Sequence, residues 1–170
     1  MKIEGGIGPY DFAGTPGAGT SEVQTLTIGG TPTGGTFKLA FDGQITAAIT
    51  WSSTNNTLRD NVDAALEALT NIGTGGVTVA VGTMTSGIGT LTITFAGNLT
   101  KQAVNLITVA LNSLEGIDPT LAVAETTPGV DADFRGASKG ALVVDVTNGI
   151  LYINTGTALA PTWTKVGTQS

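Results

Sequence analysis

The residue types that most often carry chemistry are scarce in this chain, because it contains no histidine and no cysteine. Histidine is the usual proton shuttle near neutral pH, and cysteine is a ready nucleophile and a common zinc ligand. The charged side chains that remain are 13 acidic and 7 basic groups among 170 residues. We therefore expect a protein that binds or builds structure and is not an enzyme.

The acidic residues form no recognisable site. Asp131 and Asp133 flank one alanine, but calcium takes about six to eight oxygen ligands, so two acids are better interpreted as solvated loop charges. A glycosidase needs two carboxyl groups held across a sugar cleft, whereas these acids are scattered singly. The glycine run at residues 14–19 lacks the lysine and hydroxyl residue that end a phosphate-binding loop. We predict no catalytic residue, no metal ligand and no cofactor.

Three aromatic side chains could stack on sugar rings and form a glycan-binding surface: Trp51, Tyr152 and Trp163. Packing is the simpler interpretation, since Trp51 ends an alternating strand pattern and the other two can be neighbours across adjacent strands. We expect core packing and keep a glycan-binding adhesin module as an alternative function.

The elements that must position these side chains are mainly strands. The chain has 30 threonines and 25 glycines, and β-branched side chains suit pleated sheets. The fold class we predict is mainly β with one amphipathic helix (α+β), an antiparallel β-rich domain plus a small C-terminal β-hairpin unit. The net charge of −6 repels phosphate backbones and anionic lipid, so we expect neither nucleic acid nor membrane as a partner.

Composition divides the chain into three segments. Residues 1–21 are rich in glycine and proline and predict an extended N-terminal arm, with Tyr10 and Phe12 as apolar anchors. Residues 22–127 predict the β-rich domain, and residues 128–170 the C-terminal hairpin unit.

Alternating apolar residues predict the strands of the middle segment. A helix is predicted over about residues 57–70, where apolar residues recur every three or four positions, capped by Asn56 or Thr57 and ended by residues 71–73. Residues 103–111 fit either a helix or a strand, and we favour a strand. The other predicted strands cover residues 23–28, 36–41, 45–51, 77–81, 91–95 and 121–125, with turns at 31–35, 42–43 and 82–89.

Two of these hairpins share a pattern. Residues 35–43 and 89–97 both begin with Gly-Thr, carry three apolar residues at matching positions and end in glycine. An old duplication and convergence from one residue palette both explain this recurrence.

The C-terminal unit is predicted from residues 141–154, two strands joined by Asn148 and Gly149, with a third strand at residues 162–166. Asn-Gly is the strongest short hairpin signal, because both residues tolerate positive φ. A unit of about 40 residues without disulfides holds a core poorly, so we expect it to lean on the middle domain or on copies of itself.

Several motifs resemble those of one class of protein. The sequence VQTLTIGGTPTGGTF at residues 23–37, with AALEAL at 64–69 and NIG at 71–73, resembles a module common in structural proteins of tailed bacteriophages. GASKGAL at residues 136–142, TNG at 147–149, LYINTGT at 151–157 and PTWTKVG at 161–167 are similar to a cassette of phage head-decoration and fibre proteins.

The resemblance implies a virion structural protein, often trimeric and without catalysis. We expect a capsid decoration or cement protein whose partner is the major capsid protein of the assembled head, with a tail or head fibre component as the alternative. The first residues lack the apolar run of a secretory signal, so synthesis in the host cytoplasm and residence in the virion are expected. Besides Tyr10 and Phe12 as arm anchors, the expected interface residues that face other subunits are Leu142, Val144, Ile150, Tyr152 and Trp163.

Overall fold

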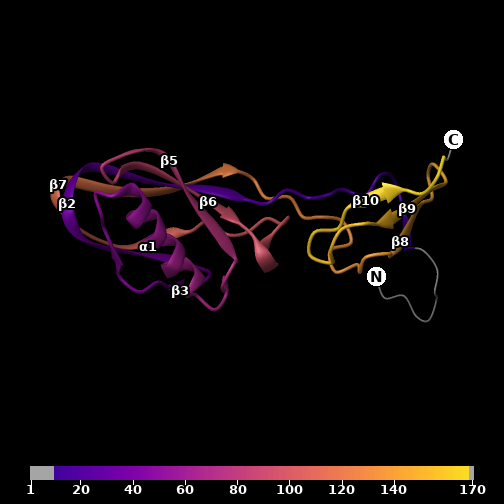
Figure 1. Ribbon diagram of the computed structural model, residues 1–170. Helices are drawn as coiled ribbons and strands as arrows, with labels where there is room; N and C mark the ends of the chain where they lie inside the picture. Colours follow the sequence, from indigo (N-terminus) through magenta and orange to yellow (C-terminus); the bar gives the residue numbers. More distant parts are fainter. Residues whose placement is uncertain (1–9, 169–170) are drawn as a thin grey trace. The chain divides into compact units, whose positions relative to one another are not determined.

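The computed structural model describes residues 10–168 and confirms a mainly β fold with a single α-helix and two sheets. The described chain forms two compact units (Figure 1). Residues 10–19 and 131–168 make the small unit, and residues 20–130 make the large unit. The large unit is thus inserted into the chain of the small one. No helix within residues 10–168 is long and apolar enough to cross a membrane.

Two long strands organise the large unit and lie side by side (Figure 1). β2 (Val23–Phe41) and β7 (Thr108–Thr127) pair antiparallel along almost their whole length. On its other side β2 pairs with β6 (Ile88–Phe95), and β6 pairs with β5 (Val77–Thr85). The β5–β6 hairpin confirms the strands predicted at residues 77–81 and 91–95. Two short strands, β3 (Gln44–Ile45) and β4 (Ile49–Thr50), complete the sheet beside the second half of β2.

The hairpin turn predicted at residues 31–35 is wrong, because β2 continues through this segment as one strand that stays paired with β7. The ladder between β2 and β7 instead contains register shifts there. Gly35 has φ +88°, and a Cβ at this position would lie 2.3 Å from the carbonyl oxygen of Ser113. Glycine at this position lets the two strands approach closely where the ladder is irregular. Because glycine also favours turns, the sequence alone does not distinguish these two roles.

The single strand predicted at residues 45–51 is also wrong, since β3 and β4 are separate. The hydroxyl oxygen of Thr46 accepts a hydrogen bond from the Leu39 amide at 3.1 Å, and so replaces a backbone acceptor. This side-chain bond interrupts the ladder between the two short strands.

The helix α1 (Asn55–Glu67) is shifted toward the N-terminus from the predicted range of 57–70. Its N-cap is Thr54, which has extended backbone angles. The C-terminal end comes early because the Thr70 amide donates to the side-chain oxygen of Gln44 at 2.9 Å, not to a helical carbonyl. The Gly73 amide then donates to the Leu69 carbonyl at 2.8 Å and closes the turn.

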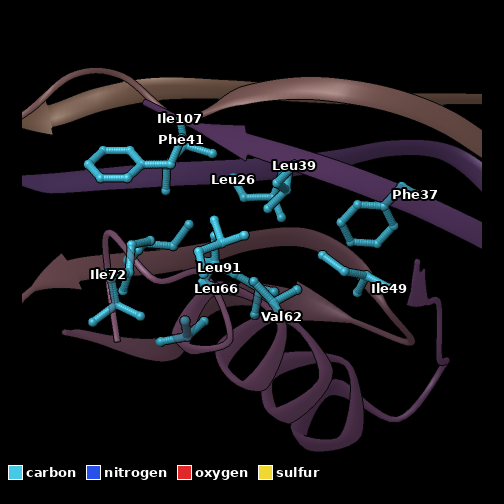
Figure 2. Close-up of a cluster of buried hydrophobic side chains, with 14 of the residues drawn as sticks. Leu26, Phe37, Leu39, Phe41, Ile49, Val62, Leu66, Ile72, Leu91 and Ile107 are labelled. Atoms are coloured by element: carbon cyan, nitrogen blue, oxygen red, sulfur yellow. The ribbon is translucent and has the colours of Figure 1, made fainter. Parts of the chain in front are cut away.

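The core of the large unit lies between α1 and one face of the sheet, as Figure 2 shows. Alternate residues of β2 and β6 point toward the helix, whose own buried residues are spaced by four. Trp51 packs against this core and donates its ring N–H to the Gly87 carbonyl at 3.1 Å. The side chains at the centre of the core include Leu26, Phe37, Leu39, Phe41, Ile49, Leu58, Val62, Leu66, Leu91, Ile93 and Ile107.

Residues 103–107 were predicted as the start of a strand, but β7 begins only at Thr108. Two buried side chains hold this segment instead, Glu22 just before β2 and Gln24 within β2. Glu22 accepts a hydrogen bond from the Val104 amide at 2.9 Å, and Gln24 accepts one from the Ile107 amide at 2.8 Å. A short 3₁₀ helix, η1 (Gly97–Leu99), precedes the segment. The strand predicted at residues 121–125 is confirmed as part of β7.

The small unit contains a four-stranded sheet in the order β1 (Tyr10–Phe12), β8 (Leu142–Asp145), β9 (Ile150–Asn154) and β10 (Trp163–Lys165). The predicted hairpin and third strand are confirmed. The chain between β8 and β9 has four residues, not the two expected from Asn148 and Gly149, since Asp145 pairs with Ile150.

The N-terminal segment is part of this sheet. β1 pairs in parallel with β8, and the remaining pairs are antiparallel. Within the described residues the predicted arm therefore does not stand apart from the C-terminal unit, because residues 10–12 supply one of its strands. Residues 1–9 of the predicted arm lie outside the described residues.

Candidate interaction surface

The sheet of the small unit buries one face. Successive side chains of a strand point to opposite faces, and in β8 and β9 the buried positions alternate with exposed or half-buried ones. Val143, Asp145, Tyr152 and Asn154 occupy the buried inner face.

Aromatic rings from three parts of the chain pack within the small unit. The rings of Phe12 and Phe134 lie 5.1 Å apart at 73°, and those of Phe134 and Trp163 lie 5.7 Å apart at 75°. Edge-to-face pairs of this kind stabilise beyond their buried area. Phe12, expected to anchor the arm elsewhere, thus contacts a ring of its own unit.

Asp145 joins the N-terminal segment to the β8–β9 turn. One carboxylate oxygen accepts hydrogen bonds from the amides of Gly14 at 2.9 Å, Thr147 at 2.9 Å and Asn148 at 3.2 Å. The other oxygen accepts one from the side-chain amide of Asn148 at 2.7 Å. These donors, the Asn148 side chain foremost, hold the pKa of Asp145 below its ordinary value of 3.8 despite burial.

Asn154 fixes backbone segments at the other end of the sheet through its own side-chain hydrogen bonds. Its side-chain oxygen accepts hydrogen bonds from the amides of Gly156 and Thr162, both at 2.9 Å. Its side-chain nitrogen donates to the carbonyl oxygens of Ala137 at 2.8 Å and Ser138 at 3.3 Å. The loop before β8 and the loop after β9 are therefore fixed by one buried side-chain amide.

The opposite face of the sheet is aliphatic in β8 and β9, and it is bordered by Asp11 of β1, paired with Val144, and Thr164 of β10, paired with Ile153. The register pairs Leu142 with Ile153 and Val144 with Leu151, which places these four side chains on the face away from Tyr152. Leu142 is 38% exposed, and the other three are half-buried. We call this set of Leu142, Val144, Leu151 and Ile153 the open face. An aliphatic patch rimmed by polar residues is a candidate surface for binding a partner.

The structure divides the expected interface residues between the two faces. Leu142 and Val144 belong to the open face, whereas Tyr152 is buried on the inner face and Trp163 stacks on Phe134. Ile150 pairs with Asp145 and shares its face. The backbone of Tyr10 pairs with Val143. Sequence reasoning missed Leu151 and Ile153, although their alternation with Tyr152 was a signal for them.

The aromatic residues considered for glycan binding are engaged in packing, as expected. Tyr152 is 7% exposed, its hydroxyl lies 3.2 Å from that of Thr15, and Trp163 donates its ring N–H to the Asp133 carbonyl at 3.3 Å. Trp51 belongs to the core of the other unit. The three rings therefore do not offer a common stacking surface from one sheet.

The loop acids likewise serve local structure. Asp133 accepts a hydrogen bond from the Gly17 amide at 2.7 Å through its side chain. Within residues 10–168 no three acidic side chains gather closely enough to hold a metal ion. Pockets of about 300 and 330 Å³ occur, one lined by Asp42, Leu99 and residues 102–105, the other by residues 134–137. Neither brings together an acid and a base, a nucleophile and a base, or two carboxylates.

No family of proteins matches the chain, and no curated protein resembles it in sequence. Among solved structures, the chain is similar to one from Mycobacterium phage Patience, with 16% sequence identity and a TM-score of 0.40. The match covers 89% of this chain and 57% of that one, so this chain spans little more than half of the other's length. Similarity at this level does not define a shared fold.

Proposed function

We propose that this chain is a structural protein of a tailed-phage virion that decorates the assembled head. In this proposal the open face of the small unit docks on the major capsid protein, and the role involves no catalysis. The observation that carries it is the aliphatic open face, on a sheet whose other face is already buried. The resemblance of residues 136–167 to head-decoration and fibre cassettes supports the same role.

The geometry suits a preformed docking surface. Asp145 and Asn154 fix the turns and loops at both ends of the sheet: both side chains accept hydrogen bonds from backbone amides, and Asn154 also donates one to a backbone carbonyl. A surface held in its bound shape loses little conformational entropy on binding, so more of the interaction energy appears as affinity. Burying an aliphatic side chain completely contributes about 1.5–3 kcal/mol. The residues of the open face are already half-buried, so each contributes a fraction of this free energy when a partner covers it.

The mechanism is linkage between binding and assembly. A protein that binds the assembled shell, and not the separate capsid subunits, stabilises the shell in proportion to the logarithm of its concentration over Kd. At a free concentration about 100 times Kd this amounts to about 2.7 kcal/mol per site. A decoration protein therefore protects a head without changing its chemistry.

Sedimentation velocity tests the proposal, first on the purified chain and then on its mixture with emptied heads of the virus that encodes it. We expect the chain to sediment with the heads in saturable amounts. A chain that ignores heads but sediments with isolated tails would contradict decoration and favour a fibre component. A chain that ignores both and changes its tryptophan fluorescence with glycans would favour an adhesin.

A further inference from the structure

The two long edges of the large sheet, at β5 and β7, differ in how far their outward backbone groups are blocked. β5 forms one edge, where the outward Val79 amide donates a hydrogen bond to the carboxylate of Asp63 on α1 at 3.0 Å. β7 forms the other edge along β2 (Figure 1). A strand edge presents unpaired backbone groups that can pair with another chain, and natural proteins usually block them.

The first half of β7 blocks its own edge. The side-chain oxygen of Asn112 accepts a hydrogen bond from the Leu114 amide at 3.1 Å. The side-chain nitrogen of Asn112 donates to the carbonyl oxygen of Pro119 at 3.0 Å. One asparagine thus occupies two backbone groups on this part of the strand.

The second half of β7 keeps its edge free. In an antiparallel sheet, successive residues of a strand direct their N–H and C=O groups to opposite sides. The Phe95 amide of β6 donates to the Glu22 carbonyl, so the backbone groups of Leu26, four residues further along, also face β6. Those of Thr25 face β7. The residue paired with Leu26 on β7 is Val123, so its N–H and C=O point away from the sheet.

The same alternation applies to Leu121 and Glu125, two positions before and after Val123. No hydrogen bond within residues 10–168 uses the outward backbone groups of these three residues. We call Leu121, Val123 and Glu125 the free edge.

We propose that the free edge binds the free edge of a second copy of this chain, antiparallel and about a two-fold axis at Val123. Val123 then pairs with Val123 of the other copy, and Leu121 with Glu125. Each copy supplies three N–H and three C=O groups, so the pair forms about six backbone hydrogen bonds. Such an interface is self-complementary, as the contact of a symmetric dimer must be.

Charge and side-chain size agree with this partner. Residues 120–124 are uncharged, and Ala122 and Ala124 are small and exposed on the outer side of the sheet. In the proposed register the two Glu125 side chains lie four residues apart along the strands, about 13 Å, which is beyond the Debye length at physiological salt. Like charges therefore do not face each other, although each copy carries a net charge of −6.

The assembly also closes at two copies. Because Asp63 accepts the hydrogen bond of the outward Val79 amide, a regular ladder between the free edge of one copy and β5 of another is interrupted at Val79, which opposes growth into a fibre. Pro119 has no N–H and ends the pairing run at its other end. The expected product is a discrete dimer with a sheet shared across the axis.

The test is the association of the full chain without heads, which keeps it separate from the proposed decoration role. Sedimentation equilibrium at concentrations up to about 100 µM should give a dimer. Val123→Pro removes an outward N–H and leaves the ladder to β2 intact, so it should weaken dimerisation at least tenfold. Val123→Thr keeps the N–H and the β-branched shape, and should dimerise like the unaltered chain.

Hydrogen exchange on the unaltered chain tests the same interface without depending on the folding of a variant. In the unaltered chain, the amides of Leu121, Val123 and Glu125 should become protected as the protein concentration rises, whereas the exposed amide of Gly43 should not. A monomer or a trimer, a Val123→Pro dimer of unchanged strength, or free-edge amides that exchange rapidly at every concentration would each overturn the proposal.

Discussion

Replacing Gln24 with leucine should destabilise the large unit more than any comparable surface change. Gln24 is fully buried and its side chain has three partners. It accepts from the Ile107 amide at 2.8 Å, and it donates to the Glu22 carboxylate at 2.6 Å and to the Asn105 carbonyl at 3.0 Å. Leucine fills a similar volume but offers none of these bonds.

The magnitude follows from the groups left behind. The variant leaves one amide, one carbonyl and one carboxylate oxygen without a hydrogen-bond partner, and each buried polar group without a partner costs about 1–3 kcal/mol. Burial of the leucine side chain returns about 1.5–3 kcal/mol. The net loss in the free energy of unfolding is then about 3 kcal/mol.

Urea denaturation measures this loss. With Trp163→Phe in the background, fluorescence comes from Trp51 alone and reports on the large unit. At a slope of about 2 kcal/mol per molar urea, the midpoint should fall by about 1.5 M.

The matched control is Gln44→Leu. Gln44 also bonds through both side-chain atoms, donating to the Thr70 hydroxyl at 2.7 Å and accepting from the Thr70 amide at 2.9 Å, but at an exposed site. Water can replace these partners, so the control should cost less than about 1 kcal/mol. Equal midpoints for the two variants would refute the reasoning that burial makes the Gln24 network essential.

Two further predictions concern Asp145 and the glycines of β2. Because the folded pKa of Asp145 is lowered, the carboxylate stabilises the small unit above its ordinary value of 3.8, and this contribution is lost as pH falls through the folded pKa. Asp145→Asn should thus be less stable than the unaltered chain at pH 7, and the difference in stability should narrow below pH 3.8. Trp163 fluorescence in a Trp51→Phe background measures the unfolding of the small unit. A difference in stability that is constant with pH would contradict this prediction. Gly35→Ala should lower the urea midpoint several-fold more than Gly43→Ala, because both have positive φ but a Cβ at Gly35 would meet the Ser113 carbonyl at 2.3 Å, whereas nothing lies within 4 Å at Gly43. Equal shifts for the two alanine variants would mean that the β2–β7 ladder relaxes freely.

Local patterns in the sequence predicted the elements whose partners lie close by in the chain. The β5–β6 and β8–β9 hairpins and the helix follow from periodicity and from glycine at the turns. The β2–β7 ladder did not follow, because its partners are far apart: Val23 pairs with Thr127. The glycines at residues 29–35 have the composition of a turn, and only the opposing strand reveals that they accommodate ladder irregularities.

The open face could be predicted only in part, because the buried residues of the small sheet include polar ones. Asp145 and Asn154 lie on the same face as Tyr152, and polar residues in a strand normally indicate the solvent side. Their burial depends on donors far away in sequence, such as the Gly14 amide, 131 residues from Asp145. No local pattern contains this information, so the expected interface set mixed the two faces.

The most direct test of the account is a binding isotherm on emptied heads for the unaltered chain and for the double variant Leu142→Ser, Ile153→Ser. Leu142 and Ile153 are cross-strand partners on the open face, and neither is part of the hydrogen-bonded inner face. The matched control is Val146→Ser, which changes a 57% exposed side chain in the adjoining turn. The account predicts that the double variant binds heads at least tenfold more weakly while the control binds like the unaltered chain. Unchanged affinity of a folded double variant would contradict the claim that the open face attaches the protein to the head.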